Sequence, residues 1–224
     1  MLLSDVITDE ECRCLVARCE ELHAEAGPAR DAPVSITLPQ GCELPQVPGS
    51  PTATGYAKAS AQLQYRLSEA GFIVSGFGGN FTYSLTALCD PESRSIAQRV
   101  GERLQARTGL RFHYGQNAAM APVNCYSASG GYIQPHRDGD LFGFGEFRTV
   151  ATIALSAGAG GQLFVNAAAE EGTHKYNRDN EDQSRREAGE IPYRAAVLFD
   201  NDRVIHGTTP TSHGRRYLLC SIII

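Results

Sequence analysis

Hydrophobic residues near the amino terminus recur at intervals of three or four, which predicts an amphipathic helix over residues 8–26. Thr8 and Glu11 have the spacing of a capping box, and Gly27-Pro28 ends the pattern. The helix would bury one stripe of apolar side chains, namely Cys12, Leu15, Val16, Cys19 and Leu22.

The following residues, through Pro51, carry six prolines, which remove too many backbone donors for a long helix or a central strand. We expect an ordered loop or lid there, and a turn at the glycine-rich segment 76–80. A weaker helical pattern covers 57–69. A stronger one opens at Asp90-Pro91 and ends near Gly109, with Ile96, Val100 and Leu104 on one face.

From residue 111 onward the pattern changes to short apolar runs separated by glycine, asparagine and aspartate. A polar stretch over 167–190 is too charged for the core, and we expect a mobile insertion near a functional rim. The chain is thus predicted to be α+β, mainly β: one domain over 1–224, with helical support and a proline-rich loop in 1–110 and a β core in 111–224. The candidate strands are 121–126, 148–156, 162–166, 194–199, 203–207 and 215–223.

Composition narrows the classes of function. The 224 residues have a formal net charge of −5, whereas a nucleic-acid binder normally carries a basic surface, so nucleic acid is disfavoured as a partner. No apolar run approaches the ~20 residues that span a bilayer, and no signal-peptide pattern opens the chain, so we expect a cytoplasmic protein with no membrane partner. Apart from Cys12 and Cys14, which one residue separates within a helical pattern, the seven cysteines lack metal-ligand spacing. They indicate reduced, mostly structural thiols.

His136 and Asp138 are two residues apart, so on a strand their side chains would point to the same side and can reach one ion. His206, from a neighbouring strand, would supply a second imidazole. Two histidines and one carboxylate on one face of an ion are typical of non-haem iron(II) oxygenases. Taken alone, the His-x-Asp pair also fits a surface histidine beside a solvated turn, HRDGD.

Arg216 favours the metal-site interpretation, because it follows His206 by ten residues at the start of the last apolar strand. A guanidinium at the edge of such a site can bind a distal carboxylate through two parallel hydrogen bonds. Its neighbour Arg215 would then face the other way, and the pattern leaves open which of the two arginines faces the site.

These residues resemble the iron(II)- and 2-oxoglutarate-dependent dioxygenases, within them the prolyl-4-hydroxylase-like branch, over most of the chain. The segments that carry the resemblance are ITDEECRCLVARCEEL, YSASGGY before the His-x-Asp pair, RTVATIALS, the Gly160-Gly161-Gln-Leu turn, and AAVLFDNDRVIHGTTPTSHGRRY.

The resemblance implies a double-stranded β-helix (jelly-roll) core buttressed by the N-terminal helices. It also implies that His136, Asp138 and His206 are the iron ligands, that Arg216 pairs with the distal carboxylate of 2-oxoglutarate, and that Tyr126 assists it. One extra residue separates Tyr132 from the metal motif, and the tail lacks a tryptophan often found in relatives.

The expected reaction is hydroxylation of an unactivated C–H bond with O2, releasing succinate and CO2, with ascorbate as a possible stimulant. Asp138 keeps the carboxylate that related halogenases lack. Position alone makes Asn124, Tyr132 and Asp140 candidate substrate contacts. Arg148, at the start of a core strand, is a candidate to contact either the substrate or a neighbouring carboxylate.

Four functions remain in competition. A small-molecule hydroxylase acting on an amino acid or natural-product intermediate comes first, and a peptidyl hydroxylase second. Nucleic-acid demethylation is disfavoured because Ile222 stands where such relatives carry a further arginine. A cupin-like metal-binding sensor or isomerase would lack its usual paired-histidine motif. The sequence leaves the oligomeric state open.

The other histidines are weaker candidates. His213 lies in a polar turn and is expected to be exposed, and His174 and His23 are expected at the surface. His113 precedes the metal strands and is expected to be structural.

Overall fold

The chain folds into two antiparallel sheets and two long helices in a computed structural model that describes residues 1–26, 35–37, 71–75, 83–111, 120–128, 130–136, 149–160, 163–166, 186–200 and 204–223. The larger sheet contains β1 (Leu2–Leu3), β2 (Ser35–Thr37), β3 (Gly71–Ser75), β4 (Tyr83–Leu88), β5 (Ala121–Tyr126), β7 (Thr149–Ala154), β10 (Ala196–Asp200) and β12 (Arg216–Ile223). Their spatial order is β1-β10-β7-β12-β5-β4-β3-β2. The smaller sheet, in the order β6-β11-β8-β9, contains β6 (Ile133–His136), β8 (Leu163–Asn166), β9 (Arg186–Gly189) and β11 (Ile205–Thr208).

The first helix, α1 (Asp9–Ala26), begins with the predicted capping box. The Thr8 amide donates to Glu11 Oε2 at 3.0 Å, and the Glu11 amide donates to Thr8 Oγ1 at 3.2 Å. Both amides belong to the helix end, where no carbonyl of the helix itself can accept from them. The predicted start and stripe of this helix are confirmed.

The second helix, α3 (Pro91–Thr108), also has the predicted ends. Asp90 caps it by accepting a hydrogen bond of 2.9 Å from the Ser93 amide. At the other end Gly109 has φ of 70°, a left-handed conformation that glycine adopts without a steric penalty, and its amide donates to the Gln105 carbonyl.

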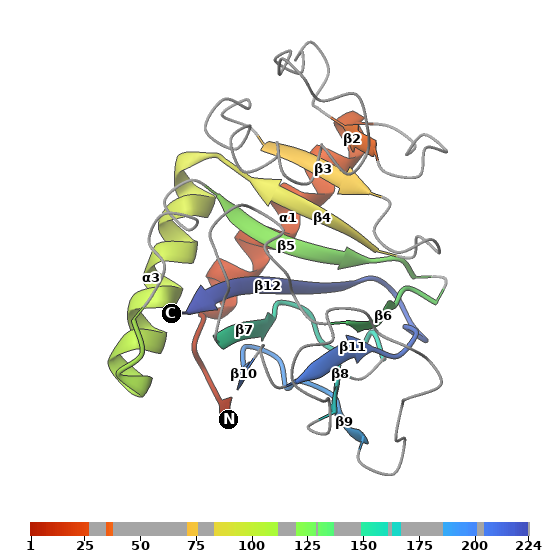
Figure 1. The fold of residues 1–224 in the computed structure, drawn as a ribbon. Helices are drawn as coiled ribbons and strands as arrows, with labels where there is room; N and C mark the ends of the chain where they lie inside the picture. The colour runs from red at the N-terminus through yellow and green to blue at the C-terminus, as the bar shows by residue number, and fades with distance from the viewer. Residues whose placement is uncertain are drawn as a thin grey trace, which may run out of the picture.

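Side chains alternate across the larger sheet and divide the core into two layers. On one face α1 and α3 pack against it, as Figure 1 shows, and this layer buries Leu15, Val100 and Tyr217 among others. The opposite face, turned toward the smaller sheet, carries Tyr126 and Leu218. Because adjacent residues of a strand point to opposite faces, Arg216 and Leu218 lie on the second face and Tyr217 on the first.

The six candidate strands after residue 111 are confirmed as β5, β7, β8, β10, β11 and β12, with ends that differ by two residues at most. The sequence pattern did not predict β3 and β4, which pair with each other and join β5. Residues 1–110 therefore supply strands as well as helices. Nor did the pattern predict β9, which lies within the polar stretch 167–190.

β2 lies within the proline-rich stretch, at the edge of the sheet, where prolines flanking a strand cost few hydrogen bonds. The helix expected over 57–69 and the turn at 76–80 fall outside the described residues. No helix among the residues that the structure describes has the length and apolar character needed to cross a membrane. The six described cysteines are free thiols.

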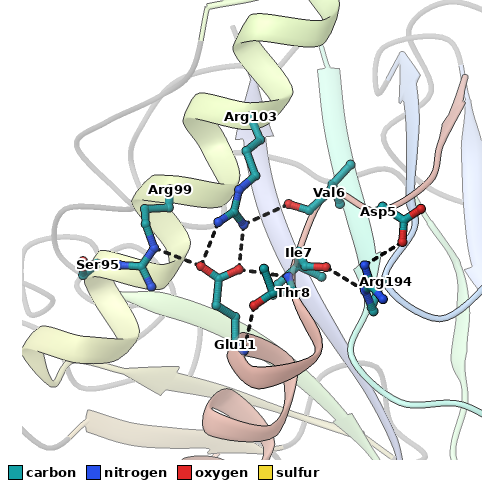
Figure 2. A network of polar contacts seen from close by, with 9 residues as sticks. All are labelled: Asp5, Val6, Ile7, Thr8, Glu11, Ser95, Arg99, Arg103 and Arg194. Atoms are coloured by element: carbon teal, nitrogen blue, oxygen red, sulfur yellow. Dashed lines mark hydrogen bonds and ion pairs between the residues drawn. The ribbon is translucent and has the colours of Figure 1, made fainter.

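The amino-terminal arm is fixed to the rest of the molecule by what we call the Glu11 clasp, formed by Glu11, Arg99 and Arg103 (Figure 2). Arg103 donates to both carboxylate oxygens of Glu11, at 2.6 and 3.0 Å, and Arg99 Nε donates at 2.9 Å. Arg103 also reaches the Val6 carbonyl at 3.2 Å. The clasp thus joins α1, α3 and the segment that leads from β1.

Candidate functional site

The two histidines of the predicted metal motif lie opposite each other in the smaller sheet. His136 is the last residue of β6, His206 lies on β11, and the two are paired across these antiparallel strands. The Cβ atoms of directly opposed residues are about 5 Å apart, close enough for both imidazoles to reach one ion. Only the backbone of His136 is described, and Asp138 lies outside the described residues.

The pairing of β6 with β11 contains a register irregularity next to His136. Along β11, His206 and Thr208 are two residues apart, but their partners on β6, His136 and Ile133, are three apart. The register therefore shifts by one residue on β6 between these pairs. A bulge of this kind is a common way to direct a side chain near an active site.

The imidazole of His206 lies between the two sheets. It is 6% exposed, and its ring packs against Phe199 of β10 with the centroids 4.5 Å apart. Thr208, two residues further on the same strand, is also buried. The ring of His206 is therefore held in a largely dehydrated environment by contact with the larger sheet.

Arg216 lines a cavity close to this pair of strands. Thr208 and Arg216 face this cavity from the two sheets. Its lining residues are Ala154, Ser156, Ala159, Gly160, Glu190, Ile191, Thr208, Arg216 and Leu218. The site thus combines a guanidinium with a largely apolar wall.

Arg216 is 7% exposed, yet the hydrogen bonds of its guanidinium are sparse. Its Nη atoms donate to the carbonyls of Gly160 and Thr209, each at 3.4 Å, and its Nε atom has no hydrogen-bond partner within the described residues. Burial lowers the pKa of Arg216, although arginine remains charged at neutral pH. A buried cation with an unused donor fits a carboxylate ligand.

Tyr126 positions this guanidinium. The two residues are paired across β5 and β12, and the Arg216 guanidinium carbon lies 4.2 Å from the centre of the Tyr126 ring, a cation–π contact. Tyr126 is fully buried and stacks on Tyr83, with the ring centroids 5.5 Å apart. Burial raises the pKa of Tyr126, which therefore stays a neutral phenol at physiological pH.

Of the four candidate substrate contacts, two lie within the described residues. Asn124 is half-buried on the same face of β5 as Tyr126, and its amide donates to Cys220 Sγ at 3.3 Å. Tyr132 is half-buried just before β6. Asp140 and Arg148 lie outside the described residues, as do His113 and His174.

Arg215, His213 and His23 differ in their exposure to solvent. Arg215 is exposed and interacts with Tyr217 and Glu20, away from the cavity. His213 is exposed, as predicted, and bonds to Ser212 at 2.8 Å. The prediction of a surface position for His23 is wrong: its ring is half-buried and bonds to Thr86 of β4 at 2.9 Å, and burial lowers its pKa.

Sequence reasoning missed three polar residues of the cavity, namely Thr208, Ser156 and Glu190. Thr208 had a usable signal, because it lies two residues after His206 and therefore shares its side of the strand. Ser156 and Glu190 follow strand ends and had no such signal.

The predicted iron ligands are only partly within the described residues. Imidazole nitrogens and a carboxylate suit iron, and the pairing of His206 with His136 brings two of the three predicted ligands together at the backbone level. Within the described ranges no three His, Cys, Asp or Glu side chains converge on a metal position. The third predicted ligand, Asp138, is outside those ranges.

Comparison with known proteins identifies the fold. No protein-family model and no curated protein sequence matches the chain. Among solved structures, a viral collagen prolyl hydroxylase from Paramecium Bursaria Chlorella virus-1, in a 2-oxoglutarate complex, matches with a TM-score of 0.51 and 11% identity, covering 100% of this chain and 94% of that one.

Two bacterial structures also match, with lower TM-scores. A Pseudomonas putida prolyl-4-hydroxylase has a TM-score of 0.45 and 16% identity, over 100% of this chain and 90% of that one. A Burkholderia pseudomallei oxidoreductase of the 2OG-Fe(II) oxygenase family has a TM-score of 0.47 and 14% identity, over 87% of this chain and 86% of that one. The resemblance seen in the sequence is confirmed at the level of the fold: this chain has the fold of the viral prolyl hydroxylase.

Proposed function

We propose that this protein is an iron(II)- and 2-oxoglutarate-dependent dioxygenase that hydroxylates an unactivated C–H bond of a small molecule, an amino acid or a natural-product intermediate. The observation that carries the proposal is the buried guanidinium of Arg216, which faces a cavity. Its Nε donor has no hydrogen-bond partner within the described residues. Thr208 of the histidine strand β11 lines the same cavity. A cation in this position fits a ligand with a distal carboxylate.

In this proposal the two sheets form a double-stranded β-helix with the site between them. His136, Asp138 and His206 hold the metal, and Arg216 binds the distal carboxylate of 2-oxoglutarate, assisted by Tyr126. When bound, metal and co-substrate supply the oxidation by O2, with succinate and CO2 as the other products. Ascorbate is expected to stimulate turnover.

The chain's own residues orient these groups and exclude water. Phe199 fixes the plane of the His206 imidazole by ring contact. The phenol of Tyr126 covers one face of the Arg216 guanidinium, so the hydrogen-bonding edge is directed to the cavity. Apolar side chains of Ile191 and Leu218 limit solvent around that edge and strengthen its attraction for a carboxylate.

A peptidyl hydroxylase is the second candidate. This candidate is supported by the viral protein that shares the fold, which is named a collagen prolyl hydroxylase. A peptide substrate would need a groove beside the metal that accepts an extended chain, whereas a small molecule needs a closed pocket. Testing both classes of substrate in one assay separates the two.

The test begins with binding to the purified full chain under anaerobic conditions. We expect one iron(II) per chain and 2-oxoglutarate binding that depends on the metal, both measured by calorimetry. Alanine at His136, Asp138 or His206 should abolish metal binding. His213→Ala is the matched control, because His213 is an exposed histidine outside the site.

Turnover is then measured in air with iron and ascorbate, as succinate released in the presence of amino acids, natural-product intermediates or proline-containing peptides. Stimulation by small molecules supports the first candidate, and stimulation by peptides alone supports the second. Metal binding that survives His206→Ala, or a wild-type chain that does not bind 2-oxoglutarate, would disprove both.

A further inference from the structure

Glu190 is an acidic residue that the proposed reaction does not use, yet it lies at the same cavity as Arg216. It directly follows β9, whose last residue, Gly189, pairs with Leu163 of β8. Glu190 is exposed, whereas the next residue, Ile191, is buried, and both line the cavity. Glu190 therefore occupies the rim, where the cavity opens to water.

The charges at this cavity are arranged with the cation inside and the anion at the rim. The buried Arg216 makes its hydrogen bonds to carbonyl oxygens, with no ion pair to a carboxylate among the described residues. Glu190 is the acidic side chain that the structure places in the cavity lining.

The electrostatic effect of Glu190 reaches the guanidinium. Burial lowers the pKa of Arg216, and the negative charge of Glu190 opposes this shift. The negative charge of Glu190 attracts the guanidinium. The same charge repels any anion that binds beside the guanidinium.

We propose that Glu190 is an electrostatic competitor for the co-substrate: it offsets the positive charge of Arg216 in the empty cavity and repels the distal carboxylate of 2-oxoglutarate, so it weakens co-substrate binding. This inference rests on the proposed function. Arginine stays protonated whether or not an anion is near, so removing Glu190 leaves the cation intact and removes only the repulsion.

The size of the effect follows from the exposure of Glu190. A fully buried pair of like charges would change affinity by orders of magnitude, but water and salt screen a carboxylate at the rim. We expect Glu190→Gln to bind 2-oxoglutarate about five-fold more tightly, as for a partly screened charge pair. Raising the salt concentration should reduce this gain, because screening weakens the repulsion in the wild-type protein.

The experiment measures dissociation constants by calorimetry under anaerobic conditions, with the iron(II)-loaded full chain and two ligands. One ligand is 2-oxoglutarate, and the other is 2-oxopentanoate, which has the same carbon chain without the distal carboxylate. Glu190→Gln should gain affinity for the first and remain unchanged for the second. Glu102→Gln, which removes an exposed carboxylate on α3, controls for net charge and should change neither.

The outcomes separate this inference from the function on which it rests. Equal or weaker binding of 2-oxoglutarate by Glu190→Gln overturns the inference alone, provided that the wild-type chain binds 2-oxoglutarate. An equal gain for both ligands also overturns it, because the effect would not involve the distal carboxylate. If the wild-type chain does not bind 2-oxoglutarate, the proposed function fails and the inference fails with it.

Discussion

The Glu11 clasp and the Arg216 cavity each contain a charged side chain removed from water, but only the clasp surrounds its charge with partners. The Glu11 side chain is 8% exposed and accepts hydrogen bonds from Arg99, Arg103 and the Thr8 amide. Arg216 is 7% exposed and has two long bonds to carbonyls. A charge with many bonds holds segments of a fold together, and one with unused bonding capacity is available to a ligand.

The largest expected effect comes from Arg216→Met. This variant should lose affinity for 2-oxoglutarate by about 100-fold, because a desolvated carboxylate would lose its ion partner. Its melting temperature should remain equal or rise, since the change removes a buried charge that lacks a carboxylate partner among the described residues. Calorimetry and thermal denaturation measure the two quantities. A marked fall in melting temperature would mean that Arg216 is chiefly structural and that the comparison with the clasp is wrong.

Glu11→Gln should have the opposite pattern. We expect the free energy of unfolding to fall by about 2 to 3 kcal/mol, less than for a fully buried pair, because Arg99 and Arg103 can regain water. Their side chains are 46% and 34% exposed. Chemical denaturation gives the change, and the affinity for 2-oxoglutarate should be unaltered. Glu102→Gln serves again as the exposed control, with little effect on stability.

Acid provides a finer test of the clasp. Burial by itself would raise the pKa of Glu11, but the hydrogen bonds from Arg103, the Thr8 amide and Arg99 outweigh it and lower the pKa from 4.5 to about 2. The folded state therefore binds this proton less readily than the unfolded state. The resulting stability is present above the unfolded value of 4.5 and is lost as the pH falls toward 2.

The measurement is the difference in unfolding free energy between the wild-type chain and Glu11→Gln as a function of pH. It should be constant above about pH 5.5 and shrink steadily as the acid protonates the carboxylate in both states. A difference that stays constant down to pH 2 would show that the ionised form of Glu11 is not what the clasp stabilises.

The sequence was sufficient where local rules determine structure and insufficient where distant segments meet. Thr8, Glu11, Asp90 and Gly109 could be assigned to helix ends because caps depend on neighbours three or four residues away. β3 and β4 were missed although β4 is almost fully buried, since glycine-rich and polar flanks obscured its short pattern. The clasp joins residues about 90 positions apart, and no local pattern encodes such a contact.

The site shows the same limit. His136, Asp138, His206 and Arg216 could be selected from spacing and resemblance, and the pairing of the two histidines agrees with that selection. Glu190 could not be selected in this way. It reaches the cavity from the end of β9, within the stretch 167–190 that the pattern assigned to a mobile insertion. The register shift on β6 could not be predicted either, because it is defined only by the pairing with β11.

The smallest expected effect comes from Arg215→Met, which tests the register of β12. Arg215 is exposed and interacts with Tyr217 and Glu20, so its loss should change the affinity for 2-oxoglutarate less than about two-fold, as for a screened surface charge. A large loss of affinity here, with Arg216→Met unaffected, would place Arg215 in the cavity. Since neighbouring residues of a strand face opposite sides, that result would also turn Tyr217 and Leu219 toward the site, against their burial beside the helices. Comparing Arg215→Met with Arg216→Met therefore shows which face of β12 is turned toward the cavity.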